Sequence, residues 1–142
     1  MRRTLATIAA TAATLALLTR TPAASAPALP LDRLAKAIAH EDDHVTQAEL
    51  NQWLEQKKKL RLIDVRSKAE FAKSHTANAE SIPMEQIARA AFDSADTIVL
   101  LSEGGAHAAQ AWVILELRGF RNVYFLRNGI SGRRYEPGRD GC

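Results

Sequence analysis

Past residue 30, apolar positions recur at the two spacings that distinguish helices from strands. Leu31, Leu34 and Ile38 share one helical face, which predicts a short amphipathic helix over 31–39. Compact apolar runs bounded by polar residues predict strands at Val45, 60–65, 80–82, 97–101 and 123–126.

The segments between these strands carry helix signals. Thr46–Glu49 and Ser67–Glu70 both have the spacing of a capping box, in which a hydroxyl and a carboxylate satisfy the first backbone N–H groups of a helix. Apolar periodicity predicts two further helices, over 84–92 and 106–118, and Gly119 is placed to end the second of them.

Strands that alternate with helices predict one α/β domain, in which a mostly parallel central sheet is flanked by helices on both faces. The run 97–101 is the most apolar of the strands, so we expect it at the centre of the sheet, buried on both sides. The domain is expected to span 44–132.

A candidate site follows this central strand. The loop and helix start consist of Ser102, Glu103, Gly104, Gly105, Ala106 and His107. Ligands of parallel sheets bind beyond the carboxyl ends of the strands. A tight glycine-containing loop that leads into a helix directs backbone N–H groups inward, which predicts an anion- or ligand-binding loop over 102–107.

The first 28 residues have the pattern of a secretory signal peptide. Arg2 and Arg3 precede an uncharged run over 5–18, and small residues with prolines follow, so that cleavage is expected after Ala26 or after Ala28. We therefore expect a periplasmic or secreted protein that is free of the membrane after cleavage. Residues 29–43 then form an N-terminal helix and linker, and 133–142 a polar C-terminal tail.

Charge and cysteine content restrict the partners. The formal charge of +3 comes from three arginines in 1–28, and the remainder has as many acidic as basic residues. This balance argues against nucleic-acid binding. Arginines are frequent in the last part of the chain, where we expect a solvated basic face. Cys142 is the one cysteine, so no disulfide can form within the chain, but one to another chain could.

We expect neither a cofactor nor a metal. The segment His40–His44 reads H-E-x-x-H, the spacing of a zinc protease motif. That chemistry needs both histidines on one helix face. Here the helix is expected to end near His40 and a strand to begin at Val45, so the segment is interpreted as an exposed acidic linker.

A further set of motifs resembles the rhodanese-like domain family over about 44–132. In the first half the resemblance rests on Leu62–Arg66, Glu70-Phe71, His75 and Ile82-Pro83. In the second half it rests on the strand 98–101, the helix 108–119, the segment 119–124 and the turn 126–130. Asp64 and Arg66 could pair with each other or with Glu70 and so fix a strand-to-helix turn. His75 is expected to be structural.

The loop departs from the pattern that the resemblance implies. Active family members begin this loop with a cysteine, have a glycine fourth and often an arginine last. Here Gly105 retains the glycine, but Ser102 stands in the place of the cysteine and His107 in that of the arginine. The family's cysteine accepts sulfur as a persulfide, which a serine cannot form.

The resemblance therefore predicts an exported rhodanese-like protein that lacks sulfurtransferase activity and acts as a binding or regulatory module. Its partner would be an unknown small anion or a protein. Two alternatives stay open. Ser102 could act with His107 as base in hydrolase-like chemistry, or Cys142 could provide residual sulfur handling.

Overall fold

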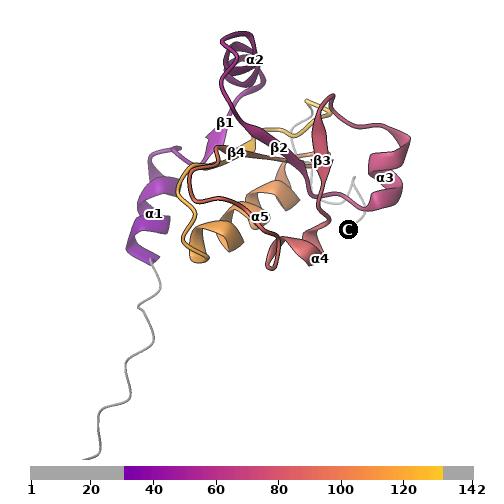
Figure 1. Ribbon diagram of the computed structural model, residues 1–142. Helices are drawn as coiled ribbons and strands as arrows, with labels where there is room; N and C mark the ends of the chain where they lie inside the picture. Colours follow the sequence, from indigo (N-terminus) through magenta and orange to yellow (C-terminus); the bar gives the residue numbers. More distant parts are fainter. Residues whose placement is uncertain (1–30, 133–142) are drawn as a thin grey trace, which may run out of the picture.

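The computed structural model describes residues 31–132 (Figure 1). The expected signal peptide, the polar tail and Cys142 lie outside these residues. Along the chain, the elements are α1 (Leu31–Ala39), β1 (His44–Val45), α2 (Gln47–Glu55), β2 (Arg61–Asp64), α3 (Lys68–Lys73), β3 (Ala79–Ser81), α4 (Met84–Ile87), β4 (Ile98–Leu101), α5 (Ala106–Leu117) and β5 (Val123–Leu126).

The five strands form one sheet in the order β1-β5-β4-β2-β3, and every neighbouring pair is parallel. The register places Leu62 beside Val99 and Ile98 beside Val123. All four residues of β4 are buried. The predicted parallel sheet with the run 97–101 at its centre is therefore confirmed.

Helices cover both faces of the sheet, as predicted. Side chains alternate between the faces of each strand. Ile63, Ile98, Leu100 and Val123 belong to one core cluster with α4 and α5, and α1 packs against it. The opposite face has a second cluster with α2, formed by Val45, Leu50, Leu62, Val99, Leu101 and Leu126.

Local capping signals set several helix ends. Thr46 and Ser67 both accept the predicted backbone hydrogen bonds at the starts of α2 and α3, so both capping boxes are confirmed. Gly119 has a φ of 97°, and the N–H of Phe120 donates to the carbonyl of Leu115. This left-handed residue ends α5, as predicted.

The helix predicted over 84–92 is wrong in its length, because α4 ends at Ile87. Arg118, the C-cap of α5, donates to the carbonyls of Ile87 (2.9 Å) and Ala90 (2.8 Å). Phe92 packs edge-to-face on Phe120. These tertiary contacts draw the chain out of the helix toward α5, and they override the local periodicity.

The helix α1 ends at Ala39 and His44 begins β1, so the H-E-x-x-H segment is not helical throughout. His40 lies in the turn after α1 and His44 lies in β1, so the two histidines do not share a helix face, as predicted. The prediction of an exposed linker is wrong at Asp43, which is 8% exposed because it packs beside β1. The Nδ1 of His44 lies 2.8 Å from an oxygen of Asp43. Over 31–132, no helix has the length and apolar character needed to cross a bilayer.

An ion-pair network at the edge of the sheet provides a prediction of pH dependence. Arg61 donates to Glu80 at 2.7 Å and to Asp96 at 3.0 Å. The hydrogen bond from Arg61 lowers the pKa of Glu80 below its ordinary value of 4.5. The stabilisation is therefore present above this value and is lost as the pH falls through the lowered pKa.

We expect Arg61→Gln to lower the free energy of unfolding at neutral pH by up to about 1 kcal/mol, because the pair is partly exposed. The loss should shrink as the pH falls from about 5 to about 2. Urea unfolding followed by circular dichroism at several pH values measures both effects, with Lys68→Gln as the control for removal of a positive charge. A loss that stays constant across this range would contradict the assignment.

Candidate functional site

The predicted loop lies between β4 and α5, at the carboxyl end of the central strand. Gly105 is the N-cap of α5 and has a φ of 89°, in the left-handed region. A Cβ at this position would lie 3.2 Å from backbone atoms of Leu126, Asn128 and Gly129. Glycine is therefore needed here for both its conformation and its small size.

Ser102 lies at the base of this loop and is 1% exposed. Its Oγ accepts hydrogen bonds from the N–H groups of Gly105 (3.1 Å) and Ala108 (3.2 Å). The side-chain oxygen of residue 102 thus lies where backbone N–H groups converge. Such an arrangement favours negative charge on the atom at its centre.

The other two polar side chains of the loop face solvent. His107 is exposed on the first turn of α5. The side chain of Glu103 is 55% exposed, and its Oε2 lies 3.3 Å from Nη1 of Arg66. The hydroxyl of Ser102 is therefore buried, whereas the ring of His107 is exposed.

Arg66 connects the loop with the end of β2. Its Nη2 and Nε donate to Asp64, with a shortest distance of 2.7 Å, and Nη2 also donates to the carbonyl of Ser74 at 2.8 Å. Asp64 is fully buried and Arg66 is 7% exposed. The hydrogen bond to Asp64 raises the pKa of Arg66, which keeps the guanidinium charged. Of the two pairings considered from the sequence, Arg66 makes the one with Asp64.

Glu70 and His75 belong to α3 and the segment after it, at the same end of the sheet. Glu70 accepts hydrogen bonds from Ser67, which lower its pKa, and the charges of Arg66 and His107 add to this effect. His75 stacks on the ring of Phe71 at 4.1 Å, and its Nδ1 lies 2.9 Å from the Phe71 carbonyl oxygen. These contacts support the end of α3.

The turn after β5 holds the loop through hydrogen bonds to its carbonyl groups. This contact was not predicted from the sequence. Ile130 donates its N–H to the carbonyl of Ser102 at 2.9 Å, and Ser131 donates its hydroxyl to the carbonyl of Glu103 at 2.8 Å. Gly129 has a φ of 64°, and a Cβ there would overlap both of these carbonyls. The predicted Asn-Gly turn after a strand beside β4 was the available signal.

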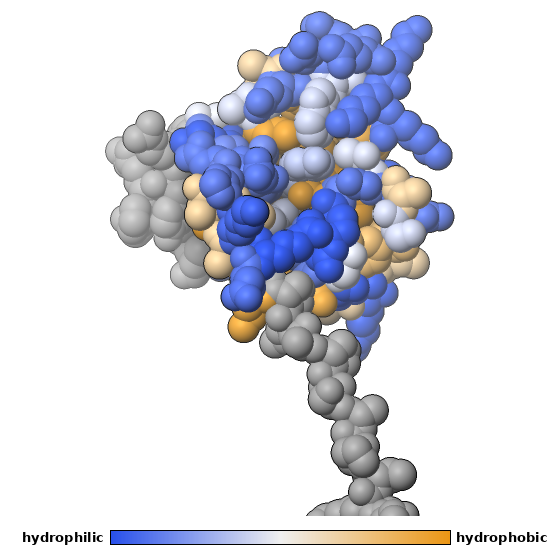
Figure 2. Space-filling model, turned by 90° about the vertical axis from the view of Figure 1, so that its left-hand side faces the viewer, coloured by the Kyte–Doolittle hydropathy of each residue, from blue (hydrophilic) through white to orange (hydrophobic). Residues whose placement is uncertain are grey.

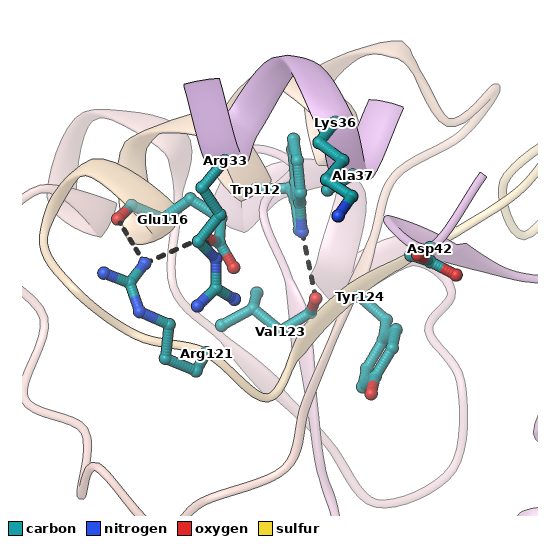
Figure 3. Close-up of a pocket in the computed structure, with 9 residues that line it drawn as sticks. All are labelled: Arg33, Lys36, Ala37, Asp42, Trp112, Glu116, Arg121, Val123 and Tyr124. Atoms are coloured by element: carbon teal, nitrogen blue, oxygen red, sulfur yellow. Dashed lines mark hydrogen bonds and ion pairs between the residues drawn. The ribbon is translucent and has the colours of Figure 1, made fainter. Parts of the chain in front are cut away.

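A polar hollow that was not predicted from the sequence lies between α1, α5 and β5 (Figure 3). Its volume is about 280 Å³. Arg33, Lys36 and Arg121 line it, together with the buried Glu116 of α5. Arg121 belongs to the arginine-rich last part of the chain; its side chain is 41% exposed and also pairs with Glu116 at 3.0 Å.

The loop can offer backbone N–H groups to an anion. The first N–H groups of a helix have no partner within the helix. At the start of α5, the N–H of Ala108 donates to the Oγ of Ser102 at 3.2 Å, and Ala106 opens the same turn. Within 31–132, no group of three His, Cys, Asp or Glu side chains is placed to hold a metal ion.

Comparison with known proteins gives matches over this domain. Residues 46–134 match the family described as "Rhodanese-like domain". The chain is 33% identical over 98 residues to the probable adenylyltransferase/sulfurtransferase MoeZ of Mycobacterium tuberculosis. The match covers 66% of this chain and 25% of that relative, so the chain spans about a quarter of the length of the curated relatives it matches.

Solved structures show the same fold. A rhodanese-like domain protein from Staphylococcus aureus has a TM-score of 0.59 at 26% identity, covering 68% of this chain and 94% of its own. The human single domain sulfurtransferase TSTD1 has a TM-score of 0.57 at 20% identity, covering 61% and 89%. A rhodanese-related protein from Thermoplasma volcanium has the same TM-score at 21% identity, covering 63% and 88%.

Proposed function

Because the chain belongs to the rhodanese-like domain family, we propose that it is a binding module that transfers no sulfur at its loop. In this proposal Ser102 occupies the position of the nucleophilic cysteine. The loop retains its backbone and binds a small oxyanion without turnover.

The observation that carries the proposal is the position of the Ser102 hydroxyl. Its oxygen accepts hydrogen bonds from the N–H groups of Gly105 and Ala108, as an anionic atom at the centre of an anion-binding loop would. Sulfur transfer needs a thiolate that can carry a sulfur atom, and an alcohol forms no persulfide. The hydroxyl therefore maintains the shape of the loop and lacks its sulfur chemistry.

The environment of Ser102 also argues against the hydrolase alternative. A serine nucleophile needs an adjacent base within hydrogen-bond reach. The oxygen of Ser102 instead accepts hydrogen bonds from two backbone N–H groups. The side chain of His107 is exposed on the first turn of α5, whereas that of Ser102 is buried. Anion binding is thus the simpler use of this geometry.

The ligand we propose is a small oxyanion at the mouth of the loop. The N-terminus of α5 supplies N–H groups and a favourable dipole. The carboxylate of Glu103 opposes the anion, although Arg66 compensates part of its charge. Weak binding is the consequence, and Glu103 is the side chain whose removal should strengthen it.

Titration with sulfate, followed by ¹H–¹⁵N NMR, tests this proposal. We expect saturable shifts of the amides over 104–108, and tighter binding in Glu103→Gln. The gain should reach at most about fivefold, because an exposed charge interaction contributes up to about 1 kcal/mol. Glu85→Gln removes the same charge from the exposed side of α4 and should leave the affinity unchanged. Loop amides that do not shift with sulfate would refute anion binding at this site.

We further propose that the protein is exported and acts in the periplasm or outside the cell. The support is the order of features in 1–28, where two arginines precede an uncharged run and a small-residue segment. An oxidising compartment would also permit Cys142 to form a disulfide with another chain.

A further inference from the structure

The hollow between α1, α5 and β5 is separate from the loop. Its wall includes Glu116, which lies ten residues after the first residue of α5. At 1.5 Å per residue, this places Glu116 about 15 Å along the helix from the loop. Figure 2 shows the side of the molecule on which α1 lies, where hydrophilic side chains gather across the middle of the surface.

A buried carboxylate organises the wall of this hollow. Glu116 is 3% exposed and therefore requires partners. Its Oε2 lies 3.5 Å from Nε of Arg33 and 3.0 Å from Nη1 of Arg121. Nη1 of Arg121 also donates to the Glu116 carbonyl at 3.3 Å. One acidic group thus holds two guanidinium groups from different elements side by side.

The two arginines retain further donors toward the hollow. A guanidinium has five N–H groups, and Glu116 engages one nitrogen of each side chain. The side chains of Arg33 and Arg121 are 49% and 41% exposed. Figure 3 shows both groups beside Glu116, with Lys36 extending from the same helix as Arg33. The arrangement presents planar donors suited to carboxylate or phosphate oxygens.

Charge in the hollow is unevenly distributed. Arg33 and Arg121 pair with the carboxylate of Glu116 and Lys36 lines the same hollow, while Asp42 lies at the other end in Figure 3. The cationic end has an excess of positive charge that a ligand could neutralise. The volume of about 280 Å³ is near the lower limit for small-molecule sites and fits a compact ligand.

We propose that this hollow is a second ligand site, which binds a compact anion carrying at least two negative charges on carboxylate or phosphate oxygens. Arg33 and Arg121 contact the oxygens, Lys36 adds charge at the rim, and Glu116 positions the arginines. The site is independent of the oxyanion loop.

Trp112 provides a reporter, since it lines the hollow and its indole N–H donates to the carbonyl of Val123 at 2.9 Å. The chain has two tryptophans, and Trp53 packs on the opposite face of the sheet. The indole cross-peak that disappears in Trp53→Phe identifies the other as Trp112. Titration of the full chain with inorganic pyrophosphate and with citrate should shift the Trp112 signal saturably. The ratio of the two affinities distinguishes a phosphate ligand from a carboxylate ligand.

Arg33→Gln and Arg121→Gln should each weaken binding of the preferred probe about tenfold, since a hydrogen bond to a charged group contributes about 1.5 kcal/mol or more. Arg89→Gln removes the same charge from an exposed position outside the hollow and should leave the affinity unchanged. Lys36→Gln keeps the two ion pairs of Glu116 with Arg33 and Arg121, so it tests the site without disturbing the buried carboxylate. This variant should also weaken binding.

Three results would overturn the second site. The Trp112 signal could stay fixed with both probes, the Arg89 control could lose as much affinity as the Arg33 variant, or Lys36→Gln could bind unchanged. Amide shifts over 104–108 without a Trp112 shift would refute the second site and leave the proposed loop function intact.

Discussion

Replacement of Asp64 by alanine is expected to lower the free energy of unfolding by about 3 to 5 kcal/mol. Asp64 is fully buried at the end of β2, and its two carboxylate oxygens accept from the buried guanidinium of Arg66. Truncation would leave that cation in a low-dielectric environment without its main partner. The cost of an uncompensated buried charge makes this loss large.

The effect should extend from stability to the loop. Arg66 connects Asp64 with the carbonyl of Ser74 and with Glu103 of the loop. When Asp64 is removed, the guanidinium is free to leave this position, and Glu103 loses a fixed partner. We therefore expect weaker sulfate binding by the loop in the variant.

Urea unfolding followed by circular dichroism measures the predicted loss. Glu103→Ala is the matched control, because it removes an acidic partner of the same arginine from an exposed position. That variant should lose less than about 1 kcal/mol. Equal losses in the two variants would show that burial of the Asp64 pair does not determine its contribution.

A second large effect is expected from a cysteine at position 102, which should gain reactivity toward thiosulfate. Ser102→Cys should allow the protein to take up sulfur from thiosulfate, which under the proposed function the wild-type loop does not do. The N–H groups of Gly105 and Ala108 point at the side-chain atom of residue 102, and the start of α5 lies beside it. These donors favour a thiolate and lower the pKa of a cysteine placed there.

The expected reaction is balanced without any other reactant. The thiolate attacks the outer sulfur of thiosulfate, the sulfur–sulfur bond breaks with its electron pair on the leaving group, and sulfite departs. A persulfide remains on residue 102. The further change His107→Arg adds a fixed cation at the loop and should increase the rate of uptake.

Mass spectrometry after thiosulfate treatment detects the added sulfur atom. The background should carry Cys142→Ser, so that residue 102 bears the one thiol. Ser74→Cys in the same background places a thiol at an exposed position outside the loop and should gain no persulfide. Equal uptake by the two thiols would mean that the loop confers no reactivity.

Much of the fold could be predicted because its signals are local. The capping boxes at Thr46 and Ser67 determine helix starts through residues three positions apart. The apolar run 97–101 identified the central strand, since it is the most apolar of the predicted strands. The length of α4 could not be predicted, because Arg118 ends it through contacts made 28 and 31 residues away.

The candidate site shows the same division between local and distant information. The loop 102–107 follows from a strand, a glycine and a helix start. Its support by Gly129 depends on the packing of β5 beside β4, which periodicity does not reveal. The hollow around Glu116 depends on the position of α1 in the fold. The ion pair between Glu116 and Arg33 therefore could not be predicted from the sequence pattern.

In the proposed function, the side chain at position 102 separates this loop from sulfur transfer. Thiocyanate formation from thiosulfate and cyanide, measured in proteins that lack Cys142, isolates the contribution of this side chain. We expect no turnover by the chain with Ser102 and measurable turnover by Ser102→Cys. Turnover by the chain that retains Ser102 and lacks Cys142 would refute a role for this side chain in blocking sulfur transfer.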